Sequence, residues 1–547
     1  MTYNFYANPK ATPQTEPIPG RESEMIKSRS GAVAFKAGDF EVLRRCLITG
    51  TSGGSFYAGK QELTQDFVEI LKRCLDVSPD RVADDIVYAS EGHAINNSAP
   101  IFALAVMSTH GSHESKRLFR YIFPKVIRTG SHFHEWLSYT KGMRGMGRVI
   151  REVATAWLSQ DIKFLTYQML KYNQRYGFSF RDELRLFKPK PQDEHYNFLY
   201  GYMAGKTQLN PNLIETMIQV DAPVKQIAWY EKLKANPELG VEAVKSGRLT
   251  HEMVAPIANM DKNVWQALFE SMPVTALIRN LANLTEHGVI SMRKTVNTNR
   301  IEQILCDPDI LRKALIHPFD LLKALKVYAS GGNLGLSKKT WVPVPRVIDI
   351  LERSLELSFH TQTPNGLVYL HAVDISGSMS CTWSVGNTAK SNDISNQLIR
   401  CSEVAALMAL VSAKTEPNYL IRGFSTKFVD LGITAKDSFQ DACKKVRNQN
   451  FGGTDASVAY DWAIANNIYA DVICFWSDGE SWAGRRHPAQ ALQDYRSRVN
   501  PNAKAIYVNL VPNLTSLADP KDPNTWDLSG FDPSAPGLIQ QIATGSV

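Results

Sequence analysis

Apolar side chains follow a helical spacing along most of this 547-residue chain, from about residue 40 to residue 365. The connections between these segments are short and carry Gly or Pro, which interrupt helices. The pattern predicts helices that include residues 62–75, 101–107, 114–123, 148–158, 162–176, 264–270, 274–284, 298–305 and 346–357. Because helix follows helix without strand patterns or a clean sequence period, we expect a solenoid of degenerate helical repeats.

The pattern changes at residue 367, where short apolar runs begin to alternate with helical segments. Strands are predicted at 367–373, 419–424, 472–476 and 505–510, and helices at 394–412, 437–448, 456–465 and 488–499. This alternation is typical of an open, mainly parallel sheet with helices on both faces. We therefore expect a flexible, Pro-containing arm over residues 1–30, a helical-repeat module over 31–365 and an α/β domain over 366–547.

Three polar loops flank apolar segments of the predicted α/β domain. Asp374, Ser376 and Ser378 form an Asp-x-Ser-x-Ser pattern after one strand, Asp478 follows another, and Thr454 lies in a Gly-Gly-Thr-Asp loop that opens a helix. Ligands of open parallel sheets bind at the carboxyl ends of strands, and carboxylate and hydroxyl oxygens suit hard cations. These five residues are therefore predicted to surround one divalent ion, Mg²⁺ in preference to Ca²⁺ or Mn²⁺. The alternative is a turn closed by side-chain hydrogen bonds alone.

Charge is unevenly distributed along the chain, although its total is only +7. Residues 111–190 contain 16 Lys and Arg against 6 Asp and Glu, a net charge of +10. From residue 367 onward the counts are 15 against 17, a net charge of −2. A concentrated basic excess is the electrostatic footprint of a protein that binds a polyanion.

Cationic residues of this basic segment are candidates for phosphate contacts: Lys141, Arg144, Arg148, Arg151, Lys171, Arg175, Arg185 and Lys188. Arg144, Arg148 and Arg151 have the i, i+4, i+7 spacing of one helical face, opposite an apolar face. Lys171 and Arg175 are spaced i, i+4 within the predicted helix 162–176. Arginine forks suit phosphate, but a solvated charged face gives the same spacing, so the pattern alone leaves both interpretations open.

Other sequence features narrow the cellular context. The seven cysteines form no Cys-x-x-Cys pair and are odd in number, which favours a reducing compartment and argues against structural zinc. The N-terminus lacks the basic and then apolar segments of a signal peptide, and no apolar run approaches the roughly 20 residues that span a bilayer, so a cytoplasmic protein without membrane association is expected.

Two further motifs are assigned no function. Residues 54–61 nearly match a phosphate-binding loop but lack the Ser or Thr after Lys60, and we interpret them as a connection. His132 and His134 are interpreted as surface residues.

Together these segments resemble the Ro autoantigen family, in which a TROVE module is joined to a von Willebrand factor A domain. The three polar loops resemble the metal-ion-dependent adhesion site of that domain. In the helical part the family stretches include residues 100–105, 171–177, 316–319 and the ten-residue block Met-Pro-Val-Thr-Ala-Leu-Ile-Arg-Asn-Leu at 272–281. The resemblance runs from about Val42 to near the C-terminus and implies a ring of HEAT-like repeats closed by a Rossmann-like A domain.

The resemblance also implies a noncatalytic, monomeric RNA-binding protein that acts in RNA quality control and degradation. The family binds single-stranded 3′ ends of misfolded noncoding RNA through the centre of the ring and small structured Y RNAs on its outer basic surface. Bacterial relatives associate with a 3′-to-5′ exoribonuclease of the polynucleotide phosphorylase type. Lys171 and Arg175 match family positions that contact Y RNA. Lys188 stands where the family usually has histidine, so positive charge is kept while aromatic stacking is lost.

Two other functional classes agree with parts of the sequence. An adhesion or scaffold protein would use the A domain to capture a partner's carboxylate without any RNA role, but the clustered basic charge argues against it. A Mg²⁺-dependent nuclease or phosphatase would need a general base or nucleophile, and the metal pattern offers only two carboxylates and neutral hydroxyls.

Overall fold

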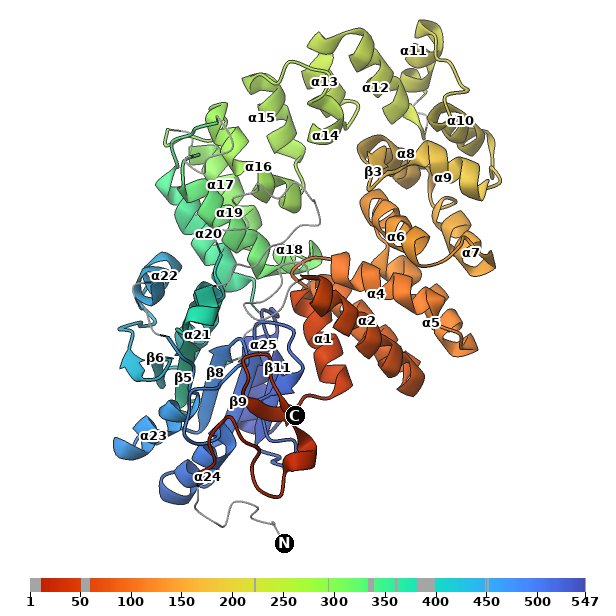
Figure 1. Cartoon of the computed structure of the whole chain (residues 1–547). Coiled ribbons are helices and arrows are strands. Elements are labelled where there is room, and N and C mark those ends of the chain that lie inside the picture. The colour runs from red at the N-terminus through yellow and green to blue at the C-terminus, as the bar shows by residue number, and fades with distance from the viewer. Residues whose placement is uncertain are drawn as a thin grey trace.

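The helices of the chain follow an arc whose two ends meet on an α/β unit (Figure 1). The structure, a computed structural model, describes residues 11–50, 60–220, 223–293, 295–332, 339–359, 363–380, 399–447, 449 and 452–546. The arc contains α1 (Asp39–Thr49), α2 (Lys60–Val77), α3 (Pro79–Tyr88), α4 (Ser98–Thr109), α5 (His113–Val126), α6 (Gly130–Met143), α7 (Arg148–Trp157), α8 (Ile162–Lys171), α9 (Phe180–Phe187), α10 (Glu194–Met203), α11 (Pro211–Gln219), α12 (Lys225–Ala235), α13 (Gly240–Lys245), α14 (His251–Val254), α15 (Lys262–Ser271), α16 (Val274–Glu286), α17 (Thr295–Leu305), α18 (Pro308–Lys313), α19 (Pro318–Ala329) and α20 (Pro345–Leu357). The predicted helical-repeat module is therefore confirmed.

Caps and amphipathic spacing explain why these segments become helices. α7 buries Ile150, Val153 and Trp157 on one face while its charged residues stay exposed. Asp161 caps α8 by accepting hydrogen bonds from the first backbone N–H groups of the helix, and Ser179 forms a capping box that starts α9. The buried side chains of α1–α10 and the adjoining parts of α11 and α12 form one cluster. Those of α13–α20 merge with one face of the sheet, so the arc and the α/β unit share a core.

A six-stranded sheet forms the centre of the α/β unit. It consists of β5 (Tyr369–Asp374), β6 (Tyr419–Phe424), β7 (Phe428–Asp430), β8 (Val472–Ser477), β9 (Lys504–Asn509) and β11 (Thr525–Ser529). Their order is β11-β9-β8-β5-β6-β7, and only β7 is antiparallel to its neighbour. One face packs against α21 (Cys401–Thr415), α22 (Phe439–Arg447) and α25 (Ala535–Thr544), and the other packs against α23 (Ser457–Ala465) and α24 (Pro488–Arg498). The four predicted strands are thus confirmed, and the two edge strands β7 and β11 are additional.

The N-terminal segment packs on the α/β unit, so the prediction of a flexible arm is wrong for residues 11–30. It forms a 3₁₀ turn (Glu22–Glu24), β1 (Met25–Lys27) and β2 (Val33–Lys36), and β2 pairs with β10 (Thr515–Ser516). Ile18 and Arg21 are almost fully buried, and the Arg21 guanidinium donates hydrogen bonds to Asp519. A short polar stretch with several prolines looks disordered in isolation because a partner such as Asp519 lies 498 residues away in sequence.

The loop before α25 joins both ends of the arc. Asp532 accepts a hydrogen bond from the Tyr88 hydroxyl (2.8 Å) and pairs with His93 Nδ1 (2.9 Å), both near the end of α3. The carbonyl oxygen of the preceding residue, Phe531, accepts a hydrogen bond from His317 Nε2 (2.9 Å), and His317 lies just before α19. One short loop of the α/β unit therefore fastens the early and the late helices to each other.

Candidate metal centre and nucleic-acid interface

The five predicted metal ligands come together at one edge of the sheet. Asp374 ends β5, and Asp478 follows β8, the strand hydrogen-bonded beside it. The Ser376 and Ser378 hydroxyl oxygens lie 3.0 Å apart in the turn after β5. The Thr454 carbonyl oxygen accepts hydrogen bonds from the backbone N–H groups of Trp482 and Ala483, which brings its loop against the one that follows β8. The carboxyl ends of adjacent parallel strands position the set, as the sequence pattern predicts.

Burial makes ionisation of the two carboxyl groups in this set unfavourable. Asp374 is fully buried and Asp478 is 3% exposed. Burial and the neighbouring Asp478 raise the pKa of Asp374 well above its usual range, against the hydrogen bonds from Ser376. Burial also raises the pKa of Asp478 to about 6, although Ser378 donates to it. Two adjacent buried carboxylates repel each other when both are ionised.

The donor set fits a divalent cation. Asp374 Oδ1 accepts a hydrogen bond from the Ser376 N–H (2.8 Å), whereas its buried Oδ2 has no partner among the described residues. A cation at this position would satisfy that oxygen and compensate both carboxylates, and hydroxyl and carboxylate oxygens match Mg²⁺. Sequence reasoning missed Ser425 at the end of β6, whose buried hydroxyl also has no described partner and whose carbonyl oxygen accepts from the Asp455 N–H (2.9 Å). Its signal was weak, since a lone Ser after a strand is common.

The predicted arginine face is interrupted by glycine-rich backbone. α7 begins at Arg148, so Arg144 lies outside that helix, at the end of α6, in extended conformation. The Arg144 guanidinium donates to the Ser108 carbonyl oxygen. Arg151 is on α7, and its guanidinium donates to the carbonyl oxygens of Met146 (3.1 Å) and Leu186 (3.0 Å). The prediction of one continuous three-arginine helical face is therefore wrong, because Gly145 and Gly147 break the helix.

The prediction that Lys171 and Arg175 share a helix is also wrong. α8 ends at Lys171, and Arg175 lies in a hairpin of β3 (Gln174–Arg175) and β4 (Phe178–Ser179). The turn residues Tyr176 and Gly177 have φ of 50° and 78°, the left-handed pair that a two-residue hairpin requires. The Lys171 ammonium group donates to the Tyr167 hydroxyl (3.0 Å) and lies 3.7 Å from Glu252 of α14, and its side chain is 12% exposed. Arg175 is exposed.

Five of the predicted cations form what we term the α6–α9 basic surface: Lys141, Arg148, Arg175, Arg185 and Lys188. Each is exposed, and within the described part of the chain none has an ion-pair partner at 4 Å or less. The elements that carry them are in contact, because Lys141 lies over the Phe178 ring of β4 (5.5 Å) and α7 packs on α9. Solvent-facing cations without carboxylate partners are available to an anionic ligand.

A buried polar pair holds α9 and the end of α8 against α6. His134 lies 2.6 Å from Glu183 through Nδ1 and 2.8 Å from the Tyr172 carbonyl oxygen through Nε2. Both side chains are fully buried, and burial raises the pKa of Glu183 to about 7. The interpretation of His134 as a surface residue is therefore wrong. His132 is half-buried, and burial lowers its pKa to about 4.

The glycine-containing loop predicted at residues 54–61 falls mostly within residues 51–59, which lie outside the described residues.

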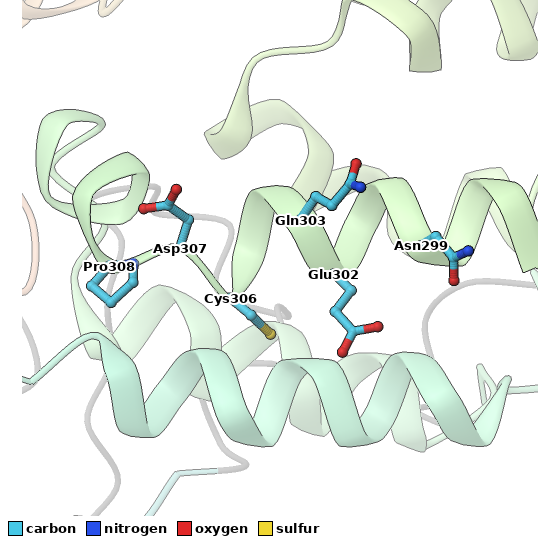
Figure 2. A pocket seen from close by; sticks show the side chains of 6 residues that line it. All are labelled: Asn299, Glu302, Gln303, Cys306, Asp307 and Pro308. Carbon is cyan, nitrogen blue, oxygen red and sulfur yellow. The ribbon is translucent and has the colours of Figure 1, made fainter.

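A wide concavity of about 620 Å³ along α17 does not share this chemistry (Figure 2). Its lining is neutral or acidic: Asn299, Glu302, Gln303, Cys306, Asp307 and Pro308. Glu302 forms ion pairs with Arg346 (2.8 Å) and Arg353 (2.6 Å) of α20. The concavity therefore presents no unpartnered cation to a polyanion among its lining residues.

Comparisons with known proteins agree with both parts of the chain. A family model described as the Ro60 vWA domain matches residues 368–543, and one described as the TROVE domain matches residues 248–354. The RNA-binding protein RO60 of Deinococcus radiodurans is 31% identical over 548 residues, which cover 99% of this chain and 98% of that protein. The RNA-binding protein RO60 of Caenorhabditis elegans is 26% identical over 597 residues, covering 95% of this chain and 90% of that protein.

A solved structure extends the likeness to three dimensions. The crystal structure of the Deinococcus radiodurans RO (RSR) protein matches with a TM-score of 0.66 and 31% identity, over 93% of this chain and all of that chain. None of the helices that the structure describes is long and apolar enough to cross a membrane. The resemblance predicted from the sequence is confirmed, and the chain belongs to the Ro60 family.

Proposed function

We propose that this protein binds RNA, and that phosphate contacts supply most of the affinity. The observation that carries the proposal is the α6–α9 basic surface, where five cations face solvent without carboxylate partners in the described structure. The relatives' name, RNA-binding protein RO60, supports it. Contacts to phosphate carry little sequence information, so the protein would recognise the shape and charge of its RNA.

Two kinds of RNA would bind at different places. A small structured RNA of the Y type would rest on the α6–α9 basic surface at Arg175, Arg185 and Lys188, because a helical RNA presents its phosphates on its outside. A single-stranded 3′ end of a misfolded noncoding RNA would pass through the ring of helices, with Arg148 as a phosphate contact, because only a free end can thread a closed ring. The protein would act in the cytoplasm as a noncatalytic monomer. It would deliver such ends to a 3′-to-5′ exoribonuclease and so take part in RNA quality control.

The A domain would bind one Mg²⁺ ion through Asp374, Ser376, Ser378, Thr454 and Asp478, some directly and some through water. The ion would supply a Lewis-acidic position for an anionic partner group. The residues of the chain would fix its geometry: the turn after β5 orients Asp374, whose Oδ1 accepts the Ser376 N–H, and both carboxylates are buried beneath the loops. Its role is adhesive, and RNA affinity would not depend on it.

RNA extracted from the purified protein tests the proposal directly. We expect the wild type to copurify with small structured RNA, and a variant with Gln at Arg148, Arg175 and Arg185 to lose most of it. A matched variant with Gln at Arg312, Arg346 and Arg353, which all have acidic partners, serves as the control. If the wild type carries no RNA, a metal-dependent scaffold role without RNA becomes the better account. If both variants lose RNA equally, the α6–α9 basic surface is not its site.

A further inference from the structure

The N-terminal segment reaches the metal edge of the A domain. We define residues 12–36 as the N-terminal strap, which continues directly into α1. Its Gln14 side chain is 1% exposed, although glutamine is usually a surface residue. A buried amide must find hydrogen-bond partners for its oxygen and its nitrogen, and those partners show what the strap holds.

Gln14 connects the two loops that carry the candidate ligands. Its Nε2 donates to Asp455 Oδ1 (3.0 Å), the residue after Thr454, and to the Arg486 carbonyl oxygen (2.9 Å). Its Oε1 accepts from the Ser481 hydroxyl (2.9 Å) and the Gly484 N–H (3.2 Å), both in the loop after Asp478. The side chain therefore fixes the spacing between the loop of Thr454 and the loop of Asp478.

The close approach at Gly484 shows how tightly Gln14 packs between the two loops. A Cβ atom at residue 484 would lie 2.3 Å from Gln14 Nε2 and 2.4 Å from Asp455 Oδ1. The backbone of Gln14 is engaged as well, since its N–H donates to the Gly484 carbonyl oxygen (3.1 Å) and its carbonyl oxygen accepts from the Val33 N–H (2.7 Å). The side-chain amide and the backbone N–H of Gln14 therefore hold the strap on the metal loops, while its carbonyl oxygen ties the strap to itself through Val33.

A second contact lies at the other end of the strap. The Ser30 hydroxyl donates to Glu480 Oε2 (2.6 Å), and the Glu480 N–H donates in turn to Asp478 Oδ1 (3.1 Å). Arg29, the preceding residue, lies 3.3 Å from Glu62 of α2 and also pairs with Asp66 of α2. Two consecutive strap residues thus touch the metal edge and the first helices of the arc.

We propose that the N-terminal strap couples metal binding to the first helices of the ring, with Gln14 as the positioning residue for the metal loops. This inference rests on the metal site of the proposed function. A cation that draws Thr454 and Asp478 into one coordination geometry stabilises the loop spacing that Gln14 requires, so strap docking and metal binding favour each other. Such linkage is reciprocal: each event strengthens the other by the same factor.

Two measurements on the full-length protein, first stripped of metal with a chelator, test the coupling. Calorimetric titration with Mg²⁺ should show at least tenfold weaker binding for Gln14→Ala. Gln493→Ala is the matched control, because its amide binds Asp522 (3.3 Å) in the same domain, and its affinity should stay within twofold of wild type. Hydrogen exchange of residues 12–36 in the wild type should slow at least tenfold at saturating Mg²⁺, and this change should vanish in Gln14→Ala.

The outcomes separate the two levels of the argument. If the wild type binds Mg²⁺ and Gln14→Ala binds it equally well, or if Mg²⁺ leaves strap exchange unchanged, the coupling is wrong and the metal site stands. If the wild type binds no Mg²⁺, the metal site fails and takes the coupling with it. The exchange measurement on the wild type needs no substitution, so the test survives if Gln14→Ala does not fold.

Discussion

Replacing Asp478 by Asn should make the metal-free protein more stable. Burial raises the pKa of this carboxyl from 3.8 to about 6, and each pKa unit corresponds to ~1.4 kcal/mol, so keeping Asp478 ionised at pH 8 costs about 3 kcal/mol. Asn keeps the shape and can still accept a hydrogen bond from Ser378, but it carries no charge. For an α/β unit of about 180 residues, the gain corresponds to a rise of roughly 6–12 °C in melting temperature.

The sign of the pH dependence follows from the raised pKa. As pH rises from 4 to 7 without metal, the unfolded Asp478 ionises first, so the wild type loses stability through this carboxyl, whereas Asp478→Asn keeps only the pH dependence of its remaining groups, the buried Asp374 among them. The gap between them should therefore be small at pH 4 and full at pH 8. Mg²⁺ should raise the melting temperature of the wild type at pH 8 and leave that of the variant unchanged.

Differential scanning calorimetry in chelator and in Mg²⁺ measures both effects. Asp430→Asn is the control, since the Asp430 side chain is 70% exposed and lies on the edge strand β7. If Asp478→Asn melts below the wild type in chelator, or if it keeps the Mg²⁺-dependent rise, the carboxylate pair is not a cation site and the electrostatic reasoning is refuted.

Three further predictions follow from single residues. Arg148→Gln should lower the slope of log affinity against log salt for single-stranded RNA by about 0.7, measured by fluorescence anisotropy, and an unchanged slope would leave Arg148 as solvated charge. Arg175→Ala should weaken the binding of structured RNA without changing the melting temperature of the protein. Lys171→Ala should lower the melting temperature because Tyr167 and Glu252 hold Lys171. Equal melting temperatures for the two variants would contradict this division of roles. Burial lowers the pKa of His317 to about 4, so the unfolded state gains a proton as pH falls from 6.5 and the fold loses up to about 3 kcal/mol by pH 4. Urea unfolding at pH 7 and 4.5 should show a smaller loss for His317→Gln, and equal losses would argue against a neutral buried His317.

The strands and metal ligands of the A domain could be predicted because two local rules agree. Every residue of β5 and β8 is buried, so both strands appear as mainly apolar runs. Parallel strands also place their carboxyl ends at one edge, which brings Asp374 and Asp478 together. The edge strand β11, with the sequence Thr-Trp-Asp-Leu-Ser, is half-buried and has no such run, so its pairing with β9 was not visible.

The cationic face was mispredicted where turn chemistry overrides helical spacing. Gly177 and Tyr176 adopt positive φ and close a hairpin, which removes Arg175 from α8. The Tyr-Gly pair was a usable signal, but the i, i+4 spacing of Lys171 and Arg175 outweighed it. Intramolecular hydrogen bonds decided the rest: the Arg144 and Arg151 guanidinium groups donate to backbone carbonyl oxygens of the protein itself, and sequence spacing cannot show that.

The N-terminal strap could not be predicted from its own residues. Gln14 is polar and flanked by prolines, and its partners Asp455, Ser481 and Gly484 lie more than 440 positions away. A buried glutamine is stable only after those loops have formed. Long-range hydrogen bonds of this kind leave no periodic signal in the sequence.

The most direct test of the RNA-binding account compares two RNAs on one variant. Arg148, Arg175, Arg185 and Lys188 are all replaced by Gln, and anisotropy is measured against salt for the copurified structured RNA and for a short unstructured 3′ tail. The account predicts at least a tenfold loss and a smaller salt slope for the structured RNA, with much smaller changes for the tail, since only Arg148 is assigned to single strands. Equal losses for both RNAs would mean one continuous binding surface, and unchanged affinity for the structured RNA would contradict the α6–α9 basic surface as its site.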